Sequence, residues 1–366
     1  MTNILTEDLE RINEADFIPW EDLRGRTIFI TGATGLIGKT LVKALHRANK
    51  LRGLRMKLLL LVRDLDRARS VFEGFLDDDA ISFTVGNVED DFHIADSIDF
   101  IIHCASQTAS RDFVEHAVET IQTIVFGTDH TLKLALEKKV KSYVFLSSME
   151  VYGYPERGHC VSEKDIGCFS PSNLRNSYPI SKIAGEALCQ AYASEYGVPA
   201  KVVRLTQTFG PGVYYGDQRL FAYMARCVIE KKDIVLKTRG ETERSYLYTT
   251  DAVTAILTVL LKGKENGIYN AADEETYCSI ADMADRVAKE NGIGVVFDIQ
   301  KEKERAFPDT LYMDLDTRAL RELGWVPSRR DSDRTIQEMM RRMISAMLTD
   351  SASGIGCTQH QSVFPN

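Results

Sequence analysis

A short apolar run that leads through a glycine-rich turn into a helical pattern constrains the chain more than any other feature. Residues 27–31 read Thr-Ile-Phe-Ile-Thr, and residues 32–38 read Gly-Ala-Thr-Gly-Leu-Ile-Gly. Glycines at these spacings permit a tight turn and a close approach of the backbone to a pyrophosphate, whose charge then lies at the helix N-terminus. Strand, turn and helix in this order predict a dinucleotide site. We expect the cofactor to contact Gly32, Thr34, Gly35, Leu36, Ile37 and Gly38.

The run at 27–31 is the first of a series of apolar runs that alternate with helical patterns. The other runs are 57–62, 81–85, 99–103, 142–147 and 201–205, and the clearest helical patterns are 118–139 and 179–195. Continuously apolar runs are typical of parallel strands covered on both faces. The alternation therefore predicts an α/β fold with a Rossmann-type, doubly wound parallel sheet, which binds ligands beyond the carboxyl ends of its strands.

Beyond residue 205 the pattern becomes irregular and rich in Gly, Tyr and Arg, before a helical pattern returns at 251–261. The last residues show no periodicity, which favours disorder. We therefore divide the chain into an N-terminal arm (1–24), a nucleotide-binding domain (25–205 plus 246–268), a smaller and partly discontinuous substrate-binding lobe (206–245 plus 269–345) and a disordered tail (346–366).

The ends of the later strands supply further cofactor candidates. The second strand ends in Arg63 and Asp64; a carboxylate there accepts the ribose hydroxyls of NAD, whereas an arginine accommodates the phosphate of NADP. NAD is the expected cofactor, and NADP stays open. At the ends of the third and fourth strands we expect contacts from Asn87, Val88, Ala105 and Ser106.

Three residues, one at the end of the fifth strand and two on the helix that follows, predict alcohol–ketone redox chemistry. Ser148 ends that strand, and Tyr178 and Lys182 lie four residues apart, on one face of the following helix. A free tyrosine titrates near pH 10, so it acts as a base near neutrality only if its pKa is lowered. We expect the Lys182 ammonium and the positive cofactor ring to lower it, and Ser148 to bind the same substrate hydroxyl.

These motifs together resemble a known family. TGATGLIG, HCAS, SSMEVYG, YPISK and RLTQTFGPG, spread between residues 26 and 327, are similar to the extended short-chain dehydrogenase/reductase superfamily, in its NAD-dependent epimerase/dehydratase branch. The resemblance implies that Tyr178 is the acid/base, that Lys182 activates it and binds the ribose, and that both contact the cofactor. It also implies a nucleotide-sugar substrate, a retained NAD and a homodimer formed through two helices of the Rossmann domain.

Two neighbouring residues refine the expected reaction. Glu150 directly precedes Val-Tyr-Gly, and in this position the chain resembles sugar-nucleotide 4,6-dehydratases and UDP-glucuronate decarboxylases. A carboxylate there can remove the C5 proton, which becomes acidic once C4 is a ketone. Met149 stands where dTDP-glucose-type dehydratases place an aspartate that protonates the leaving hydroxyl, and methionine donates no proton. We therefore expect a lyase, similar to UDP-glucuronate decarboxylases or to dehydratases.

The resemblance also implies residues that bind the nucleotide sugar. Residues 105–110 are similar to the substrate loop of the decarboxylases, although they lack its prolines, and Gln207 replaces the usual asparagine of the Arg-x-x-Asn element. Forked guanidinium groups suit phosphate oxygens, so arginines are candidates for the diphosphate. The expected substrate contacts are Ser110, Gln207, Arg219 and Arg244.

Composition excludes several classes of protein. A net charge of −8 argues against a nucleic-acid partner, and the longest apolar runs are too short to span a bilayer. The seven cysteines show neither CxxC pairs nor zinc-like spacing, so we expect reduced thiols and no metal site. The first residues lack the apolar core of a signal peptide, and we expect a cytoplasmic protein.

Three alternatives stay open beside the lyase: a nucleotide-sugar 4-epimerase, an NADP-dependent reductase of a keto substrate, and a cofactor-binding scaffold without catalysis. The complete set of Ser148, Tyr178 and Lys182 argues against the scaffold.

Overall fold

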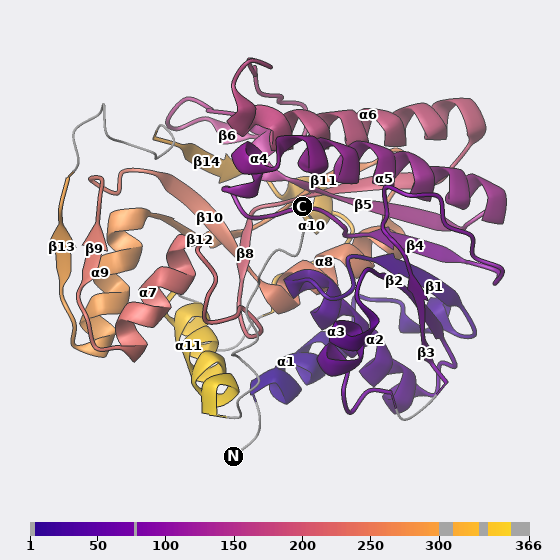
Figure 1. The fold of residues 1–366 in the computed structure, drawn as a ribbon, viewed down its shortest axis with the longest axis horizontal. Helices are drawn as coiled ribbons and strands as arrows, with labels where there is room; N and C mark the ends of the chain where they lie inside the picture. The colour runs from indigo at the N-terminus through magenta and orange to yellow at the C-terminus, as the bar shows by residue number, and fades with distance from the viewer. Residues whose placement is uncertain (1–3, 77–78, 300–309, 329–335, 353–366) are drawn as a thin grey trace, which may run out of the picture.

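A seven-stranded parallel sheet forms the centre of the molecule (Figure 1). The computed structural model describes residues 4–76, 79–299, 310–328 and 336–352. The strands lie in the order β11-β7-β5-β4-β1-β2-β3, so the chain winds outward in both directions from β1, and the Rossmann-type fold is confirmed. Their bounds are β1 Thr27–Thr31, β2 Lys57–Val62, β3 Ile81–Val85, β4 Phe100–His103, β5 Ser142–Ser148, β7 Ala200–Leu205 and β11 Ile268–Ala271.

Two layers of helices cover this sheet, and alternate residues of each inner strand pack against one layer or the other. In β2, Leu58 and Leu60 pack on one face, while Leu59 and Leu61 pack on the other. Both faces are thus buried, which is why the strands read as unbroken apolar runs. One face is covered by α5 (Ala117–Lys138) and α6 (Ser177–Tyr196), and the other by α2 (Leu36–Arg52) and α8 (Thr249–Lys262). The short helices α3 (Leu65–Val71), α4 (Asp112–Glu115), η2 (Met149–Tyr152) and η3 (Leu174–Asn176) lie in the connections.

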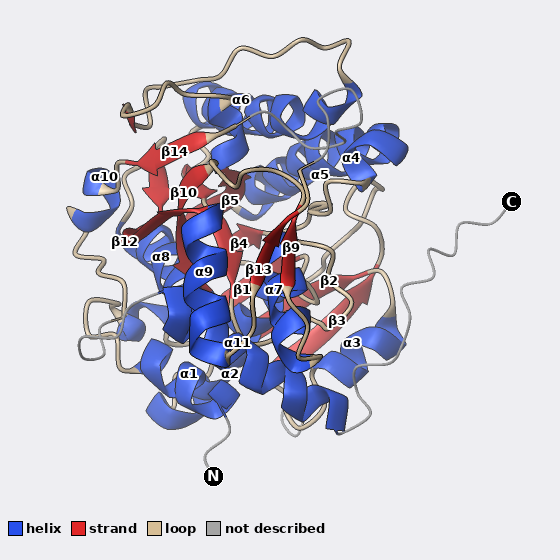
Figure 2. Ribbon diagram, turned by 90° about the vertical axis from the view of Figure 1, so that its left-hand side faces the viewer, coloured by secondary structure: helices blue, strands red, loops and turns tan. Residues whose placement is uncertain are grey.

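Smaller sheets and the helices α7, α9 and α11 form a lobe beside the carboxyl edge of the large sheet (Figures 1 and 2), whereas α10 packs on β11. A five-stranded sheet has the order β12-β10-β14-β6, with β8 paired to β10, and β13 pairs with β9. Helices α7, α9 and α11 share an apolar core with these strands. The bounds are β6 Cys160–Val161, β8 Gln207–Phe209, α7 Leu220–Ile229, β9 Ile234–Leu236, β10 Glu243–Tyr248, β12 Asp273–Ser279, α9 Ile280–Asn291, β13 Val295–Phe297, β14 Tyr312–Leu315, α10 Arg318–Arg321 and α11 Ile336–Ala352.

Three boundaries drawn from the sequence need correction. Strand β11 extends the large sheet through Ala271, so residues 269–271 belong to that sheet and not to the lobe. Strand β10 lies in the five-stranded sheet, so residues 246–248 belong to the lobe and not to the nucleotide-binding domain. Helix α11 continues to Ala352, so residues 346–352 are helical and not a disordered tail. The helix continues here from the apolar turns that precede residue 346, although the last residues themselves show no periodicity. The rest of the predicted tail lies outside the described residues, as does Cys357; the other six cysteines are free thiols.

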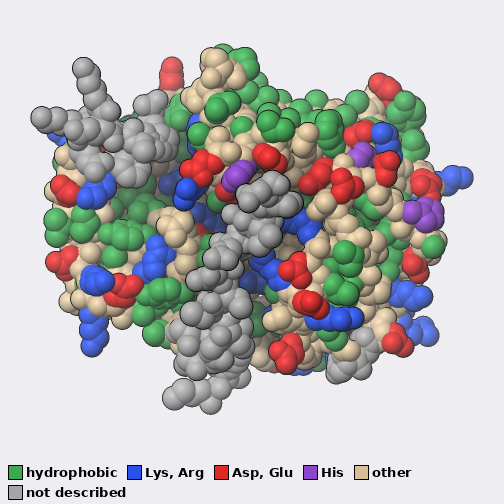
Figure 3. Space-filling model, viewed as in Figure 1, with side chains coloured by type: hydrophobic (Ala, Val, Ile, Leu, Met, Phe, Trp, Pro, Cys, Tyr) green, Lys and Arg blue, Asp and Glu red, His purple; other side chains and the backbone are tan. Residues whose placement is uncertain are grey.

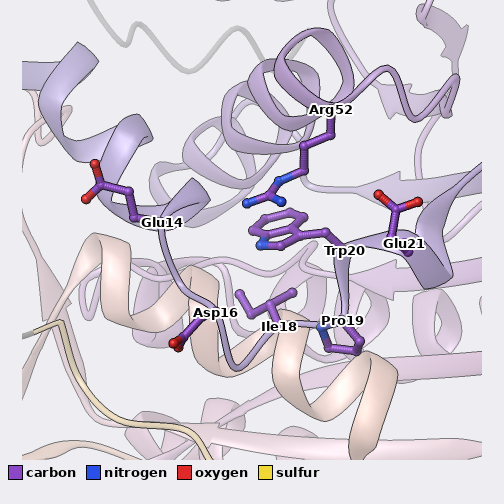
Figure 4. Close-up of a pocket in the computed structure, with 7 residues that line it drawn as sticks. All are labelled: Glu14, Asp16, Ile18, Pro19, Trp20, Glu21 and Arg52. Atoms are coloured by element: carbon purple, nitrogen blue, oxygen red, sulfur yellow. The ribbon is translucent and has the colours of Figure 1, made fainter.

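The N-terminal arm packs on the large sheet's helices. Leu9 and Ile12 of α1 (Ile4–Asn13) and Trp20 of η1 (Trp20–Leu23) are buried in the core that α2 and α8 share. Figure 4 shows the Arg52 guanidinium over the Trp20 indole, 5.4 Å from the ring centroid, at the mouth of a cavity of about 390 Å³. Arg52 ends α2, so this cavity lies at the amino edge of the sheet, opposite the glycine turn.

A buried ionic cluster joins the two ends of the described chain. The Arg342 guanidinium on α11 donates to the Asp8 carboxylate at 2.7 Å and to the Tyr248 hydroxyl at 3.1 Å. The Tyr248 hydroxyl donates in turn to Asp8 at 2.8 Å. Burial raises the pKa of Asp8, and the Arg342 charge offsets part of that rise. We call Asp8, Tyr248 and Arg342 the terminal cluster.

Candidate functional site

The glycine turn brings backbone segments closer together than any side chain would allow. Gly32 has a φ of +65°, and a Cβ there would meet the backbone of Ala105 at 2.7 Å. A Cβ on Gly38 would lie 2.2 Å from the Gly32 carbonyl oxygen, so only glycine lets α2 start against the turn. Thr34, Leu36 and Ile37 are half-buried along this turn and the first turn of α2. This backbone cradle at a helix N-terminus fits a dinucleotide pyrophosphate.

A buried pair of polar side chains fixes the loop that faces the glycine turn. The Thr31 hydroxyl and His103 Nδ1, at the ends of β1 and β4, lie 2.7 Å apart, and the Ala105 amide donates to the Thr31 oxygen at 3.2 Å. Burial lowers the pKa of His103 to about 3, so its ring is neutral. These contacts hold the half-buried Ala105 and Ser106 against the cradle.

At the expected adenosine end of the site, the Arg63 side chain is exposed, whereas the Asp64 carboxylate already forms a hydrogen bond within the protein. The Asp64 carboxylate accepts the Arg67 amide at 2.9 Å and so caps α3. Asn87 is half-buried, and Val88 packs against Gly127 of α5, where a Cβ would lie 2.7 Å from a Val88 methyl group. The close approach of α5 therefore depends on this glycine.

The three expected catalytic residues meet at the carboxyl end of β5. Ser148 is its last residue, and hydrogen bonding connects the Tyr178 hydroxyl to Ser148 and to Ser106. The Lys182 Nζ donates to the Leu146 carbonyl at 2.7 Å and lies 5.7 Å from the Tyr178 ring centroid. Helix α6 comes this close because Gly185 contacts Phe145, where a Cβ would lie 2.7 Å from the ring.

The pKa of Tyr178 moves opposite to our expectation when the protein residues act alone. Burial, followed by the charge of Glu150, raises the pKa of Tyr178, and hydrogen bonds to Ser148 and Ser106 with the charge of Arg175 only partly offset the rise. Burial also lowers the pKa of Lys182 to about 7, which weakens the ammonium as a stabiliser of phenolate. The described protein groups on their own therefore do not lower the pKa of Tyr178.

Two residues that the sequence motifs did not identify complete this site. Arg175 of η3 pairs with Glu150, with 2.9 Å between Nη2 and Oε2, and its guanidinium lies 4.8 Å above the Phe113 ring. The Phe113 ring stacks on Tyr178 at 4.3 Å with 9° between the planes. The available signal was the position of Arg175 three residues before Tyr178, at the start of the same helical segment.

Met149, in contrast, turns away from the site. Its side chain is buried in an apolar cluster with Val151 and Tyr152 of the same short helix, η2. The Thr206 hydroxyl lies 3.3 Å from its sulfur. The position therefore contributes to packing and offers no acid to a ligand.

The expected substrate residues come from four different segments of the chain. Ser110 is exposed in the loop before α4. Gln207 on β8 lies opposite Tyr246 on β10. Arg244 precedes Tyr246 by two residues on the same strand, and its buried Nε has no hydrogen-bond partner among the described residues. Arg219 forms a bidentate pair with Asp217 at 2.6–3.1 Å, so part of its fork is already used. In Figure 3, Lys and Arg side chains (blue) lie along the middle of the molecule, between lobe and sheet.

The model of the NAD-dependent epimerase/dehydratase family matches residues 28–272, which include the glycine turn, Ser148, Tyr178 and Lys182. The chain belongs to this family. NAD is thus the cofactor of its family, and the glycine cradle fits it.

Curated relatives in the epimerase/dehydratase family are nucleotide-sugar enzymes. A trifunctional UDP-glucose 4,6-dehydratase/UDP-4-keto-6-deoxy-D-glucose 3,5-epimerase/UDP-4-keto-L-rhamnose-reductase of Arabidopsis thaliana is 26% identical over 309 residues, 82% of this chain and 44% of that protein. UDP-glucuronic acid decarboxylase 1 of Xenopus tropicalis is 27% identical over 233 residues, 63% of this chain and 53% of that protein. The chain spans from 34% to about half of the length of the curated relatives it matches.

Solved structures in the family share the fold. A dTDP-glucose 4,6-dehydratase from Bacillus anthracis, in complex with NAD, superposes with a TM-score of 0.70 at 17% identity, covering 89% of this chain and 98% of that one. Across the described ranges, no helix of this family member is both long and apolar enough to cross a membrane. The same ranges contain no group of three His, Cys, Asp or Glu side chains placed to hold a metal ion.

Proposed function

We propose that the chain is a nucleotide-sugar lyase that retains NAD and works through a 4-keto intermediate. The observation that carries the proposal is a second acidic group, Glu150, beside the set of Ser148, Tyr178 and Lys182 and electrostatically coupled to Tyr178. Oxidation at C4 needs one acid/base group, whereas chemistry at C5 or C6 needs another. The names of the curated relatives are consistent with such a reaction.

Each residue then has a role. Tyr178 takes the proton of the C4 hydroxyl and later returns it, while Ser148 binds the same hydroxyl. NAD, when bound, supplies the hydride acceptor and completes the positive charge that Tyr178 needs. In a dehydration, Glu150 removes the C5 proton once C4 is a ketone. In a decarboxylation, the C4 ketone takes up the electron pair of the broken C5–C6 bond, and protonated Glu150 then donates a proton to C5. We propose that the cofactor lies on the large sheet, with the nucleotide sugar between it and the lobe, where Gln207, Arg219 and Arg244 are the candidate contacts.

Decarboxylation fits the site better than loss of water. The side chain of Met149 is buried and donates no proton, so the leaving hydroxyl of a dehydration lacks the acid expected there. Carbon dioxide leaves a 4-keto uronic acid without such an acid. A plain 4-epimerase, which needs only Tyr178, is the second candidate, and incubation with a panel of nucleotide sugars followed by mass and NMR analysis of the products decides among the three.

A redox-neutral reaction predicts how the cofactor behaves. We expect the purified protein to carry NAD(H), released on denaturation and quantified by chromatography, and to turn over without added cofactor. Consumption of one NADPH per product would contradict the lyase and support the reductase, for which the exposed Arg63 would hold the phosphate.

Glu150→Gln separates the lyase from the epimerase, because it keeps the shape of the side chain and removes the base. We expect the variant to form the 4-keto sugar nucleotide and to accumulate it, which mass spectrometry detects. The control is Glu156→Gln, an exposed glutamate in the same connection, which should leave the product unchanged. Normal product from Glu150→Gln would mean that Glu150 has no chemical role.

We also propose a homodimer formed through α5 and α6. On α5, Val118 is 61% exposed and Ile121 43%, and these two side chains lie one turn apart on one face. The neighbouring surface of α6 carries exposed small residues, Ala187 and Ala191, that allow close helix approach. Exposed apolar residues grouped in this way are typical of interaction surfaces.

A further inference from the structure

Glu150 is held at both its backbone and its side chain. Its amide donates to the Ser148 hydroxyl at 3.2 Å, and its carboxylate pairs with Arg175. Both charged side chains are between a quarter and a third exposed, so the pair lies at the rim of the site and not in the core. The carboxylate that the proposed function needs is therefore placed by one guanidinium.

Arg175 is itself fixed by an aromatic stack that ends on the reacting group. Its guanidinium lies on the Phe113 ring, and that ring lies parallel to the ring of Tyr178. The Ser177 hydroxyl donates to the Phe113 carbonyl at 2.7 Å, which ties α4 to the start of α6. A change in Arg175 therefore reaches Glu150 by an ion pair and Tyr178 through one intervening ring.

Charged groups of both signs surround Tyr178. The charges of Glu150 from η2 and Arg175 from η3 act on its hydroxyl, which also hydrogen-bonds with the hydroxyls of Ser106 and Ser148, while Lys182 of α6 lies over its ring. The Glu150 charge raises the pKa of Tyr178 and the Arg175 charge lowers it. Glu150 beside Tyr178 therefore hinders formation of phenolate unless a cation compensates.

We infer that Arg175 is a positioning residue, which holds the Glu150 carboxylate at the substrate and balances its charge beside Tyr178. The inference rests on the proposed function, because Glu150 matters only if a second acid/base step exists. It assigns to Arg175 two separable effects: one on geometry, which needs the guanidinium fork, and one on charge, which any cation supplies.

Two variants of Arg175 separate these effects. Arg175→Met should lower kcat by about 10–100-fold, because a small misplacement of a reacting group is enough for such a loss. It should also move the ascending limb of the pH profile of kcat/KM up by about 0.5–1 unit, since the uncompensated Glu150 charge raises the pKa of Tyr178. Arg175→Lys keeps the charge, so it should lower kcat while leaving the pH profile near that of the wild type.

A double variant tests whether Arg175 acts through Glu150. The measured quantity is formation of the 4-keto sugar, the step that Glu150→Gln is expected to retain. With both charges removed, Glu150→Gln/Arg175→Met should lie within about 2-fold of Glu150→Gln in rate, because coupled residues are not additive. The control, Arg341→Met, breaks an exposed pair between Arg341 of α11 and Glu290 of α9, and it should match the wild type throughout.

Crystal structures of the wild type, Arg175→Met and Arg175→Lys show the position of the Glu150 carboxylate independently of any activity measurement. We expect the Glu150 carboxylate to leave its place in Arg175→Met. If Glu150 stays there and the pH profile superposes on the wild type, the inference is overturned. If the wild type converts no nucleotide sugar but Glu150 moves in the variant, the proposed function fails and the positioning role stands.

Discussion

Tyr178→Phe is expected to lower turnover by about 10²–10⁴-fold, which is what a positioned acid/base group contributes. The phenyl ring keeps the stack with Phe113, 4.3 Å away, so the fold and the site should remain intact. Only the hydroxyl that meets Ser148 and Ser106 is lost. Steady-state rates on the nucleotide sugar, measured together with the NAD content and the melting temperature, test this expectation.

The matched control for Tyr178→Phe is Tyr196→Phe at the other end of α6, where the ring is 57% exposed. The control should keep wild-type rates. Near-normal turnover by Tyr178→Phe would place the active site elsewhere in the chain.

Arg342→Met is expected to destabilise the chain by about 3–5 kcal/mol, because it leaves the Asp8 charge buried without its main partner. Only 2% of Asp8 is exposed. Burial raises the pKa of Asp8, and loss of Arg342 raises it further, so the folded chain takes up this proton at higher pH than the unfolded chain. The loss of stability should therefore be complete at neutral pH and should shrink as the pH falls through the folded pKa of Asp8.

Denaturant unfolding at neutral and mildly acidic pH measures this difference, and the exposed neighbour Arg341→Met is the control. Adding Asp8→Asn to Arg342→Met should recover part of the stability, since the buried charge is then absent. Equal stability of the wild type and Arg342→Met would mean that water reaches the terminal cluster.

The sheet was predictable because its inner strands, such as β2, are buried on both faces. Residues 57–62 and 81–85 were expected as strands and are β2 and β3 with the same bounds. The pattern fails where burial is one-sided or the element is short. Strand β11 was assigned to the lobe because residues 269–271 follow a loop and carry no extended apolar run.

In the site, sequence motifs indicated the glycines of the turn and the catalytic candidates Ser148, Tyr178 and Lys182, but missed residues that act through contacts between separate connections. Gly32 and Gly38 were recognisable because only glycine fits their places. The stack of Arg175 on Phe113 joins two irregular connections 62 positions apart, and no periodicity relates them. The pKa of Tyr178 was also out of reach, since its direction depends on how deeply the phenol is buried.

The terminal cluster has a consequence for the order in which the chain is made. Asp8 and Arg342 are 334 positions apart, so at about 5–20 residues per second the partner of Asp8 leaves the ribosome roughly 20–70 s after it. The apolar side of α1 can pack on α2 early, but Asp8 on its acidic side has no Arg342 to pair with until α11, the last described helix, has been made. The nascent chain therefore carries an incompletely docked α1 until Arg342 has been made.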